Sequence, residues 1–195
     1  MITKSKLWFI TGVIISLTVP FLSSTLFAQT SISWDQTISA SISTTGEEDT
    51  YTFTASANDK VIVRMSRTSG YYLNPEIRLY GPDGTQTCEA HASDGSVGQG
   101  GSSYTEISSC TLTSDGTYTI IASDYKGNAS GDYNLSLDRL NVGGGSSISF
   151  DQTMSASLVV GGLDSYTFTA SANDKVIVRM SRTSGYYLNP EIRLY

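Results

Sequence analysis

The stretch "YTFTASANDKVIVRMSRTSGYYLNPEIRLY" spans residues 51–80, and the same 30 residues return without a change at 166–195. Within it, apolar and polar residues alternate in "YTFTA" and "VIVRM", and the polar segments "ANDK" and "SGYYLNP" separate the alternating runs. Alternation with a period of two is typical of a strand with one buried face, and Asn, Asp, Gly and Pro are typical of turns. The stretch therefore predicts short strands joined by turns, and it predicts them twice.

The residues before each copy also match: "SISWDQTISASISTTGEEDT" at 31–50 faces the shorter "SISFDQTMSASLVVGGLDS" at 147–165. Trp34, Ile38 and Ile42 share one parity, and the second copy replaces them with Phe, Met and Leu. Exchange among apolar residues at every second position is what a packed strand face requires. We therefore predict that this segment is a strand with its apolar side turned inward.

Similar alternation recurs at 117–123 and 133–138, and the turn segments "GPDG", "SDG" and "KGNASG" lie between the runs. The pattern gives about eight short strands per repeat and no convincing helical period. Strands at this spacing indicate an all-β fold, either an antiparallel sandwich or a barrel.

The offset of 115 residues between the copies is an ordinary domain size and divides the chain into units. We expect a signal peptide at 1–28, a first β-domain at 29–141, a Gly-rich linker at 142–146 and a second repeat at 147–195. The second repeat holds only the first half of the unit, so we expect it to be incomplete, with apolar strand faces uncovered and the natural sequence continuing.

Residues 1–28 have the layout of a secretory signal peptide, because two lysines precede an uncharged apolar run and small residues lead to Ala28. A retained membrane anchor is the alternative, since residues 7–27 are about long enough to span a bilayer. Cleavage after Ala28 removes two lysines and no acidic residue, so the net charge moves from −6 to −8. Such an acidic surface repels phosphate, and we expect an extracellular or cell-surface protein that does not bind nucleic acid.

Cys88 and Cys110 are the only cysteines of the chain. An even number of cysteines in an exported protein favours a disulfide, and we expect these two to be bonded. Zinc is the competing use, but two thiols without a nearby cluster of ligands make a poor zinc site.

Three segments resemble, in their order and spacing, the pre-peptidase C-terminal domain of bacteria and archaea: "DTYTFTASANDKVIVRM", "LNPEIRLYGPDGT" and "DGTYTIIASDYKGNASGDYNLSL". The resemblance implies a jelly-roll-like β-sandwich on a secreted protein, often beside a peptidase. It also implies links to secretion, substrate attachment or, in collagenases, collagen and calcium binding. Here Gly81 stands where the family often has Asp, and the segment between the cysteines looks like a local elaboration.

Catalytic chemistry is not expected. His91 is the only histidine, and "CEAHASDGSVGQGG" around it reads as a loop. The sequence contains no nucleophile elbow, HExxH helix, phosphate-binding loop or dinucleotide motif. We therefore expect a protein that is not an enzyme.

Calcium is the one cofactor considered, with Asp83, Asp115 and Asp124 as candidate ligands at predicted turns. Carboxylate oxygens suit this hard cation, but an Asp-Gly turn is equally explained by Asp accepting hydrogen bonds from its own backbone. No EF-hand spacing is present.

Tyr71 and Tyr72, with their copies Tyr186 and Tyr187, are the candidate ligand-binding residues. Two adjacent aromatic residues on a loop do not both reach the core easily, and exposed tyrosines suit contact with sugar or peptide. The alternative is that one of each pair packs against the end of the domain.

These features predict a noncatalytic secreted or surface module for adhesion, substrate attachment or spacing. The alternative is the accessory region of a secreted peptidase whose catalytic domain lies outside these residues. The expected partners are an extracellular matrix protein, a polysaccharide or a peptide substrate. The oligomeric state is not predicted.

Overall fold

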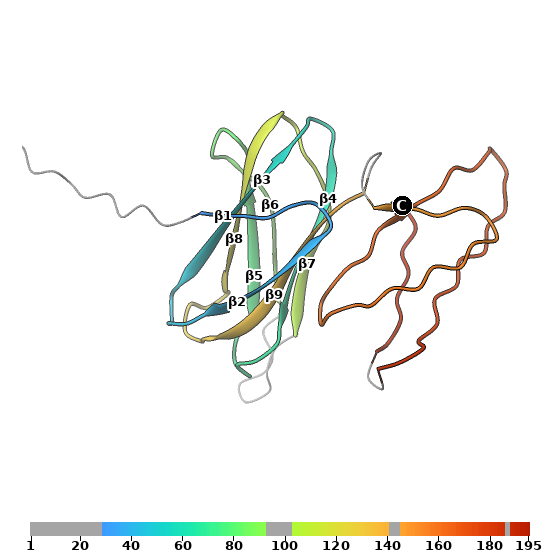
Figure 1. Ribbon diagram of the computed structural model, residues 1–195. Helices are drawn as coiled ribbons and strands as arrows, with labels where there is room; N and C mark the ends of the chain where they lie inside the picture. Colours follow the sequence, from blue (N-terminus) through green and yellow to red (C-terminus); the bar gives the residue numbers. More distant parts are fainter. Residues whose placement is uncertain (1–28, 93–102, 141–144, 186–187) are drawn as a thin grey trace, which may run out of the picture.

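The computed structural model describes residues 29–92, 103–140, 145–185 and 188–195 (Figure 1). The predicted signal peptide at 1–28 and the tyrosine pair Tyr186 and Tyr187 lie outside the described residues. The described part is all-β, as the sequence predicted, and contains no helix long and apolar enough to cross a membrane. Its strands are β1 (Thr30–Ser31), β2 (Gln36–Ile42), β3 (Glu48–Ala55), β4 (Lys60–Arg67), β5 (Pro75–Tyr80), β6 (Gln86–His91), β7 (Tyr104–Thr111), β8 (Gly116–Asp124), β9 (Gly131–Arg139), β10 (Ser146–Ser147) and β11 (Tyr166–Thr167).

Two sheets form a sandwich from β1 to β9 (Figure 1). One has the strand order β1-β3-β8-β5-β6 and the other has the order β2-β9-β4-β7. All pairs in them are antiparallel apart from the two-residue parallel pair of β1 with β3. The sandwich, rather than the barrel, is therefore the fold, and the added strand beyond the predicted eight is the short β1.

The core lies between the two sheets and is filled by residues of one parity on each strand. Trp34 and Ile38 are half-buried against this core, and Ile42 is buried, which confirms the predicted inward side of this segment. The inward residues of the long strands are Tyr51, Phe53 and Ala55 on β3, Val61, Val63 and Met65 on β4, Ile77 and Leu79 on β5, Tyr118, Ile120 and Ala122 on β8, and Tyr133, Leu135 and Leu137 on β9.

A chain of three polar groups joins the sheets through this core. The Tyr133 hydroxyl on β9 donates to Asp49 Oδ2 at 2.6 Å, so the Tyr51 hydroxyl on β3 donates to the Tyr133 oxygen at 2.7 Å. Burial raises the pKa of Tyr133 above its ordinary range, and the bond to Asp49 adds to this. Burial also raises the pKa of Asp49, while the Tyr133 hydroxyl opposes that rise. The two tyrosines therefore stay protonated. The hydrogen bond from Tyr133 replaces one that the Asp49 carboxylate loses from water on folding.

Tyr133→Phe should lower the free energy of unfolding by about 1.5–3 kcal/mol at neutral pH, because it takes a donor from a part-buried carboxylate. Without this donor the folded-state pKa of Asp49 rises further, so the loss should grow as pH increases from about 4 to 7. Urea denaturation at several pH values measures both effects. Tyr51→Phe is the control, because it removes a hydrogen bond but leaves Asp49 its donor. A deficit in Tyr133→Phe that is independent of pH would contradict the assignment.

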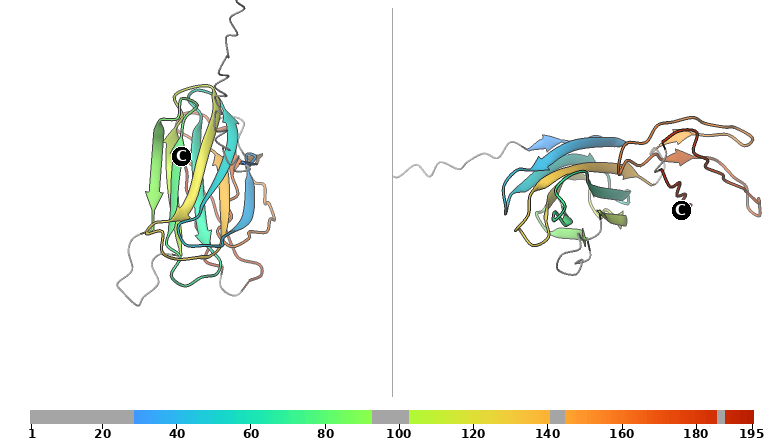
Figure 2. Two further views of the ribbon diagram at one scale, coloured as in Figure 1. Left: turned by 90° about the vertical axis from the view of Figure 1, so that its left-hand side faces the viewer. Right: turned by 90° about the horizontal axis from the view of Figure 1, so that it is seen from below.

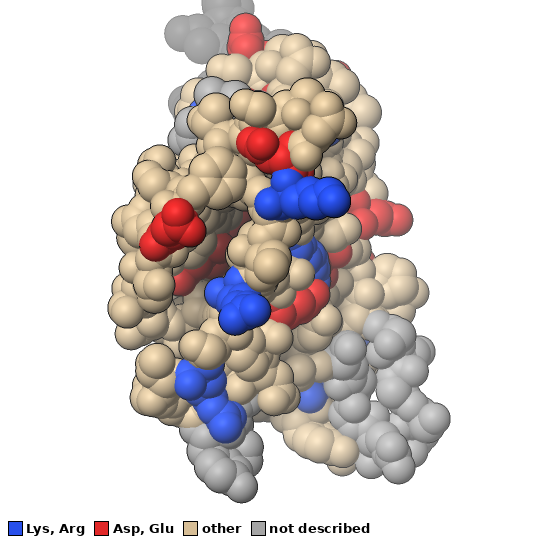
Figure 3. Space-filling model, turned by 90° about the vertical axis from the view of Figure 1, so that its right-hand side faces the viewer, with Lys and Arg blue, Asp and Glu red and all other residues tan. Residues whose placement is uncertain are grey.

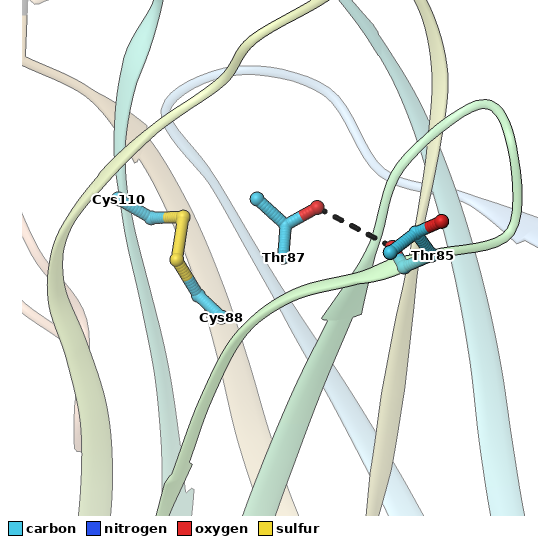
Figure 4. Close-up of a disulfide and its surroundings, with 4 residues drawn as sticks. All are labelled: Thr85, Thr87, Cys88 and Cys110. Atoms are coloured by element: carbon cyan, nitrogen blue, oxygen red, sulfur yellow. Dashed lines mark hydrogen bonds between the residues drawn. A yellow bond between two sulfur atoms is a disulfide. The ribbon is translucent and has the colours of Figure 1, made fainter.

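The disulfide between Cys88 and Cys110 is present, as predicted (Figure 4). It joins β6, the edge strand of one sheet, to β7, the edge strand of the other, with the two Cα atoms 6.4 Å apart. Cys110 is buried and Cys88 packs against the core. The bond therefore joins the two sheets along the side formed by β6 and β7. Among the described residues, neither of these edge strands has a strand partner on its outer side.

Reduction of this bond should lower the free energy of unfolding by about 3 kcal/mol, since the bond closes a loop of roughly 23 residues in the unfolded chain. Urea denaturation with and without reductant measures the difference. A Cys88→Ala/Cys110→Ala double variant should not respond to reductant. Two alkylatable thiols in the non-reduced protein would contradict the prediction.

Residues 145–195 repeat local features of the first sandwich without its long strands. β10 and β11 pair in parallel as β1 and β3 do, with Ser146 opposite Tyr166 where Thr30 is opposite Tyr51. Positive φ angles recur at equivalent positions, for example 70° at Asn58 and 73° at Asn173. The apolar residues of this segment are largely exposed. Val178, Met180, Ile192 and Leu194 of the expected strand face are exposed, but Val176 of that face is half-buried and Ile177, of the opposite parity, is exposed too.

Candidate functional site

Several strands begin or end together at one end of the sandwich. β4 ends at Arg67, where it pairs with the first residues of β7 and β9. β5 begins at Pro75, opposite Asp124 at the end of β8, and its next residue pairs with His91 at the end of β6. The segments that leave β4, β6 and β8 therefore lie at the same end, which is lowest in Figure 1 and faces the viewer in the right-hand view of Figure 2.

This end carries four exposed tyrosines. The exposed fractions are 58% for Tyr71, 66% for Tyr72, 45% for Tyr104 and 40% for Tyr125. Within residues 29–92 and 103–140 these are the only large apolar side chains with such exposure. We call this surface the tyrosine end. Its composition suits binding, because tyrosine offers a large, rigid contact area and a polar hydroxyl at low entropic cost.

Tyr71 and Tyr72 stand on the loop between β4 and β5 and pack edge to face, with ring centroids 5.2 Å apart. Arg67 holds this loop, because its Nη1 donates to the carbonyl oxygens of Tyr71 at 2.5 Å and of Leu73 at 2.9 Å. The same guanidinium lies 5.8 Å from the centre of the Tyr71 ring. Leu73 is buried, so the loop is anchored just after the two exposed rings. Both tyrosines face outward, and neither belongs to the core.

The loop is also fixed to the start of β9. The Ser69 hydroxyl donates to Asp132 Oδ2 at 2.7 Å, and the Asp132 amide donates back to the Ser69 oxygen at 3.0 Å. Hydrogen bonds from Ser41 and Ser69 lower the pKa of Asp132. Gly70 has a φ of 74° and approaches the backbone so closely that a Cβ there would meet the Ser130 carbonyl oxygen. The loop that carries the tyrosine pair is thus held in place by its own contacts with β9.

His91 and Tyr125 form a second aromatic pair at this end. Their rings are parallel within 6° and their centroids lie 4.0 Å apart. The prediction that His91 lies in a loop is wrong, because it is the last residue of β6, paired with Glu76. Its partner is an aromatic ring, and no nucleophile is bonded to its side chain among the described residues. This arrangement places two stacked aromatic rings at the tyrosine end.

A groove of about 690 Å³ opens between the edge strands β6 and β7. His91 stands on one side and Tyr104 on the other, and Glu89 and Glu106 add negative charge. Arg64 lies over the Tyr104 ring, 5.3 Å from its centre, and pairs with Glu106. Arg193 also lines this groove, so the groove lies between the first sandwich and residues 145–195.

The calcium candidates do not come together. Asp124 lies at the tyrosine end, where it accepts hydrogen bonds from the amides of Asn74, Asn128 and Ala129. Asp83 and Asp115 lie in turns at the opposite end and accept amides from Thr85 and Ala57. No group of three or more His, Cys, Asp or Glu side chains in the described ranges could hold a metal ion. Each carboxylate here acts as a cap for backbone amides.

The fold and the exposed end define a compact β-sandwich module with an aromatic contact surface. Residues 47–124 match the family of the bacterial pre-peptidase C-terminal domain. The resemblance noted in the sequence is therefore confirmed, and the first sandwich carries a domain of this family. Such domains are generally noncatalytic accessory modules of secreted proteins, often of peptidases, and the disulfide agrees with an oxidising compartment.

Three solved structures are similar to this chain. The pre-peptidase C-terminal domain of a collagenase from Bacillus anthracis has 17% identity and a TM-score of 0.44, with 56% of this chain and 93% of that chain covered. PliG, a periplasmic inhibitor of g-type lysozyme, matches from Aeromonas hydrophila with 14% identity, a TM-score of 0.38 and coverage of 56% and 95%. PliG from Salmonella Typhimurium has 18% identity, a TM-score of 0.39 and coverage of 57% and 98%. A search of curated proteins found no match to this chain.

Sequence reasoning found half of the tyrosine end. Tyr71 and Tyr72 were candidates because they are adjacent on a loop. Tyr104 and Tyr125 were missed, because each stands alone in its segment and only the sheet topology brings the segments to one end. A signal was available in "SDYKGN", where Tyr125 lies in a turn among polar residues.

Replacing both Tyr71 and Tyr72 by Ala should change the free energy of unfolding by no more than about 0.5 kcal/mol per position, because both rings face solvent. Leu73→Ala is the matched control in the same loop and should cost about 2–5 kcal/mol, because it opens a cavity in the core. Thermal denaturation of the three proteins measures the contrast. A large loss in the double tyrosine variant would show that the pair supports the core.

Proposed function

We propose that this protein is a noncatalytic extracellular module that attaches to a matrix protein, a polysaccharide or a peptide substrate through its tyrosine end. The observation that carries the proposal is the gathering of Tyr71, Tyr72, Tyr104 and Tyr125 at one end of the sandwich. Exposed apolar side chains that collect on one surface mark an interaction site more often than single scattered ones do.

The chemistry of the end favours a ligand with flat or apolar faces. The rings of Tyr71 and Tyr72 stand at 86° to each other, so they present one ring face and one ring edge. The His91–Tyr125 stack adds a second flat element, and the hydroxyls supply hydrogen-bond donors and acceptors. A sugar ring or an extended peptide with proline or aromatic side chains fits such a surface.

A role as the accessory region of a secreted peptidase is the second candidate. The family match supports it, because domains of this family often accompany peptidases. In that case the tyrosine end holds the substrate while a catalytic domain on the same polypeptide cleaves it. A catalytic serine or zinc motif encoded beyond Tyr195 would favour this role over simple adhesion.

Binding to immobilised collagen, chitin and cellulose tests the attachment function. The protein should be retained by at least one of them, and Tyr71→Ala/Tyr72→Ala should weaken retention about tenfold or more, as expected for aromatic hot spots. Tyr80→Ala is the control, because Tyr80 ends β5 at the opposite end of the sandwich. Equal binding by all three proteins would contradict a role for the tyrosine end. Failure to bind any surface would favour a spacer.

A further inference from the structure

The outer face of the four-stranded sheet is polar but is not left in solvent. Thr37 Oγ1 and Ser136 Oγ are hydrogen-bonded at 2.8 Å, and Ser39 Oγ donates to Asn134 Oδ1 at 2.7 Å. These pairs cross from β2 to β9 on the side away from the core. The outward residues Ser66, Asn134, Ser136 and Asp138 are nevertheless buried.

The second copy of the repeat covers this face. Figure 1 shows residues 145–195 next to β7 and β9, and the views in Figure 2 agree. Asn134 Nδ2 donates to the Val160 carbonyl at 2.7 Å, and Ser136 Oγ donates to the Gly161 carbonyl at 3.2 Å. Ser165 Oγ donates to Asp138 Oδ1 at 2.9 Å. Three polar groups on β9 therefore have their partners in one seven-residue loop, 159–165.

A charged contact continues the interface onto β7. Arg193 pairs with Glu106, whose other oxygen is held by Arg64, and the Tyr195 hydroxyl donates to the Ser108 carbonyl at 3.3 Å. The Glu106 side chain is only 6% exposed. The buried Glu106 carboxylate thus has one oxygen on each of two guanidiniums, and these charge-assisted contacts fix the position of Arg193.

Differences between the two copies explain why the second one can make these contacts. In the first copy, Arg78 pairs with Glu48 of its own unit. In the second copy, Leu163 stands at the position of Glu48, and Arg193, the equivalent of Arg78, pairs with Glu191 of its own unit and with Glu106 of the first. The neighbouring Glu47 is replaced by Gly, so the docking loop has lost two negative charges that would face the acidic groups Asp138 and Glu106.

The close approach of the loop backbone at Gly161 adds to the charged contact. Gly161 has a φ of 74°, and a Cβ there would run into the Ser66 side chain. The equivalent Gly46 has a φ of 79°, but a Cβ there would meet only the Gly127 carbonyl, at 3.9 Å. The backbone requirement is thus the same in both copies, while the close approach is found only where the second copy meets the sheet.

We propose that the outer face of β2-β9-β4-β7 is a docking surface for the following copy of the repeat, which binds it through residues 159–165 and Arg193. The partner is defined by the sequence of the second copy: a glycine at 161, no acid at 162 and 163, and an arginine at 193 that pairs with Glu106. The view from the side of the second copy shows basic and acidic side chains, several of them adjoining, on a mostly uncharged surface (Figure 3). Consecutive repeats are therefore fixed to one another by specific contacts and not only by the chain between them.

Paramagnetic relaxation in the full chain tests the docking. A spin label on Val160→Cys, whose side chain is 65% exposed, should broaden the amide signals of residues 64–66 and 134–138 and spare those of β5 and β6. Gly161→Ala should abolish the broadening, because the added Cβ meets Ser66. Gly185→Ala is the matched control, with a φ of 77° and its nearest neighbour 3.9 Å from the added Cβ. No broadening in the parent, or equal broadening in both glycine variants, would overturn the proposal.

A second variant separates the charged contact from the glycine. Arg193→Gln removes the guanidinium that pairs with Glu106 and should weaken the contact of the second copy with β7. A mixture of spin-labelled protein with unlabelled, isotope-enriched protein should show no broadening. Broadening in that mixture would mean that the face binds another chain, and it would overturn docking within the chain.

The docked arrangement also has a pH signature. Asp138 is buried by the second copy and faces Asp35 before β2, Asp164 in the second copy and Arg64 on β4. Burial, with the two nearby carboxylates, raises its pKa to about 6. A group whose pKa is raised on docking favours docking below that pKa and opposes it above. The broadening should therefore weaken as pH rises from 5 to 7.5, and Asp138→Asn should remove this dependence; an identical pH profile in Asp138→Asn would contradict the role of Asp138.

Discussion

The sandwich depends on pairing between strands that are far apart in the sequence. β3 pairs with β8, and β2 and β4 pair with β9, so the first half of the repeat makes its ladders with the second half. The repeated 30 residues show the consequence. At 51–80 they form most of β3 and all of β4 and β5, and among the described residues of 166–195 they form only the two-residue β11. Strand formation is thus decided by the partner more than by the residues themselves.

The turns and short-range side-chain contacts of the repeat do not need its second half. Ser33 and Ser149 each donate a backbone amide to a glutamine side chain three residues ahead, at 2.8 Å in both copies. The aromatic pair Trp34–Phe53 is matched by Phe150–Phe168, again edge to face. Turns, caps and neighbouring contacts are encoded within a few residues, so they persist where the ladders do not.

This division also explains what could be read from the sequence. Period-two alternation identified the inward residues of β3, β5 and β8, because a sheet with one buried face imposes it. It failed for β6, an edge strand with the sequence "QTCEAH", whose side chains are mostly half-exposed and carry no apolar alternation. The tyrosine end was only half predicted, because it is assembled by topology from several segments. The burial of Ser136 and Asp138 could not be predicted at all, since polar residues on an outward parity give no sign that another part of the chain will cover them.

The docking face and the tyrosine end are different parts of the first sandwich, and they meet at the groove that His91, Tyr104 and Arg193 line. Docking of the second copy uses the face of a sheet, while the exposed tyrosines lie on the loops at one end. Tyr71, Tyr72, Tyr104 and Tyr125 all stay exposed with residues 145–195 in place. An arrangement that joins repeats through sheet faces therefore leaves the loop ends available for a ligand. Where several such modules are joined, weak contacts at single ends can add up to strong attachment.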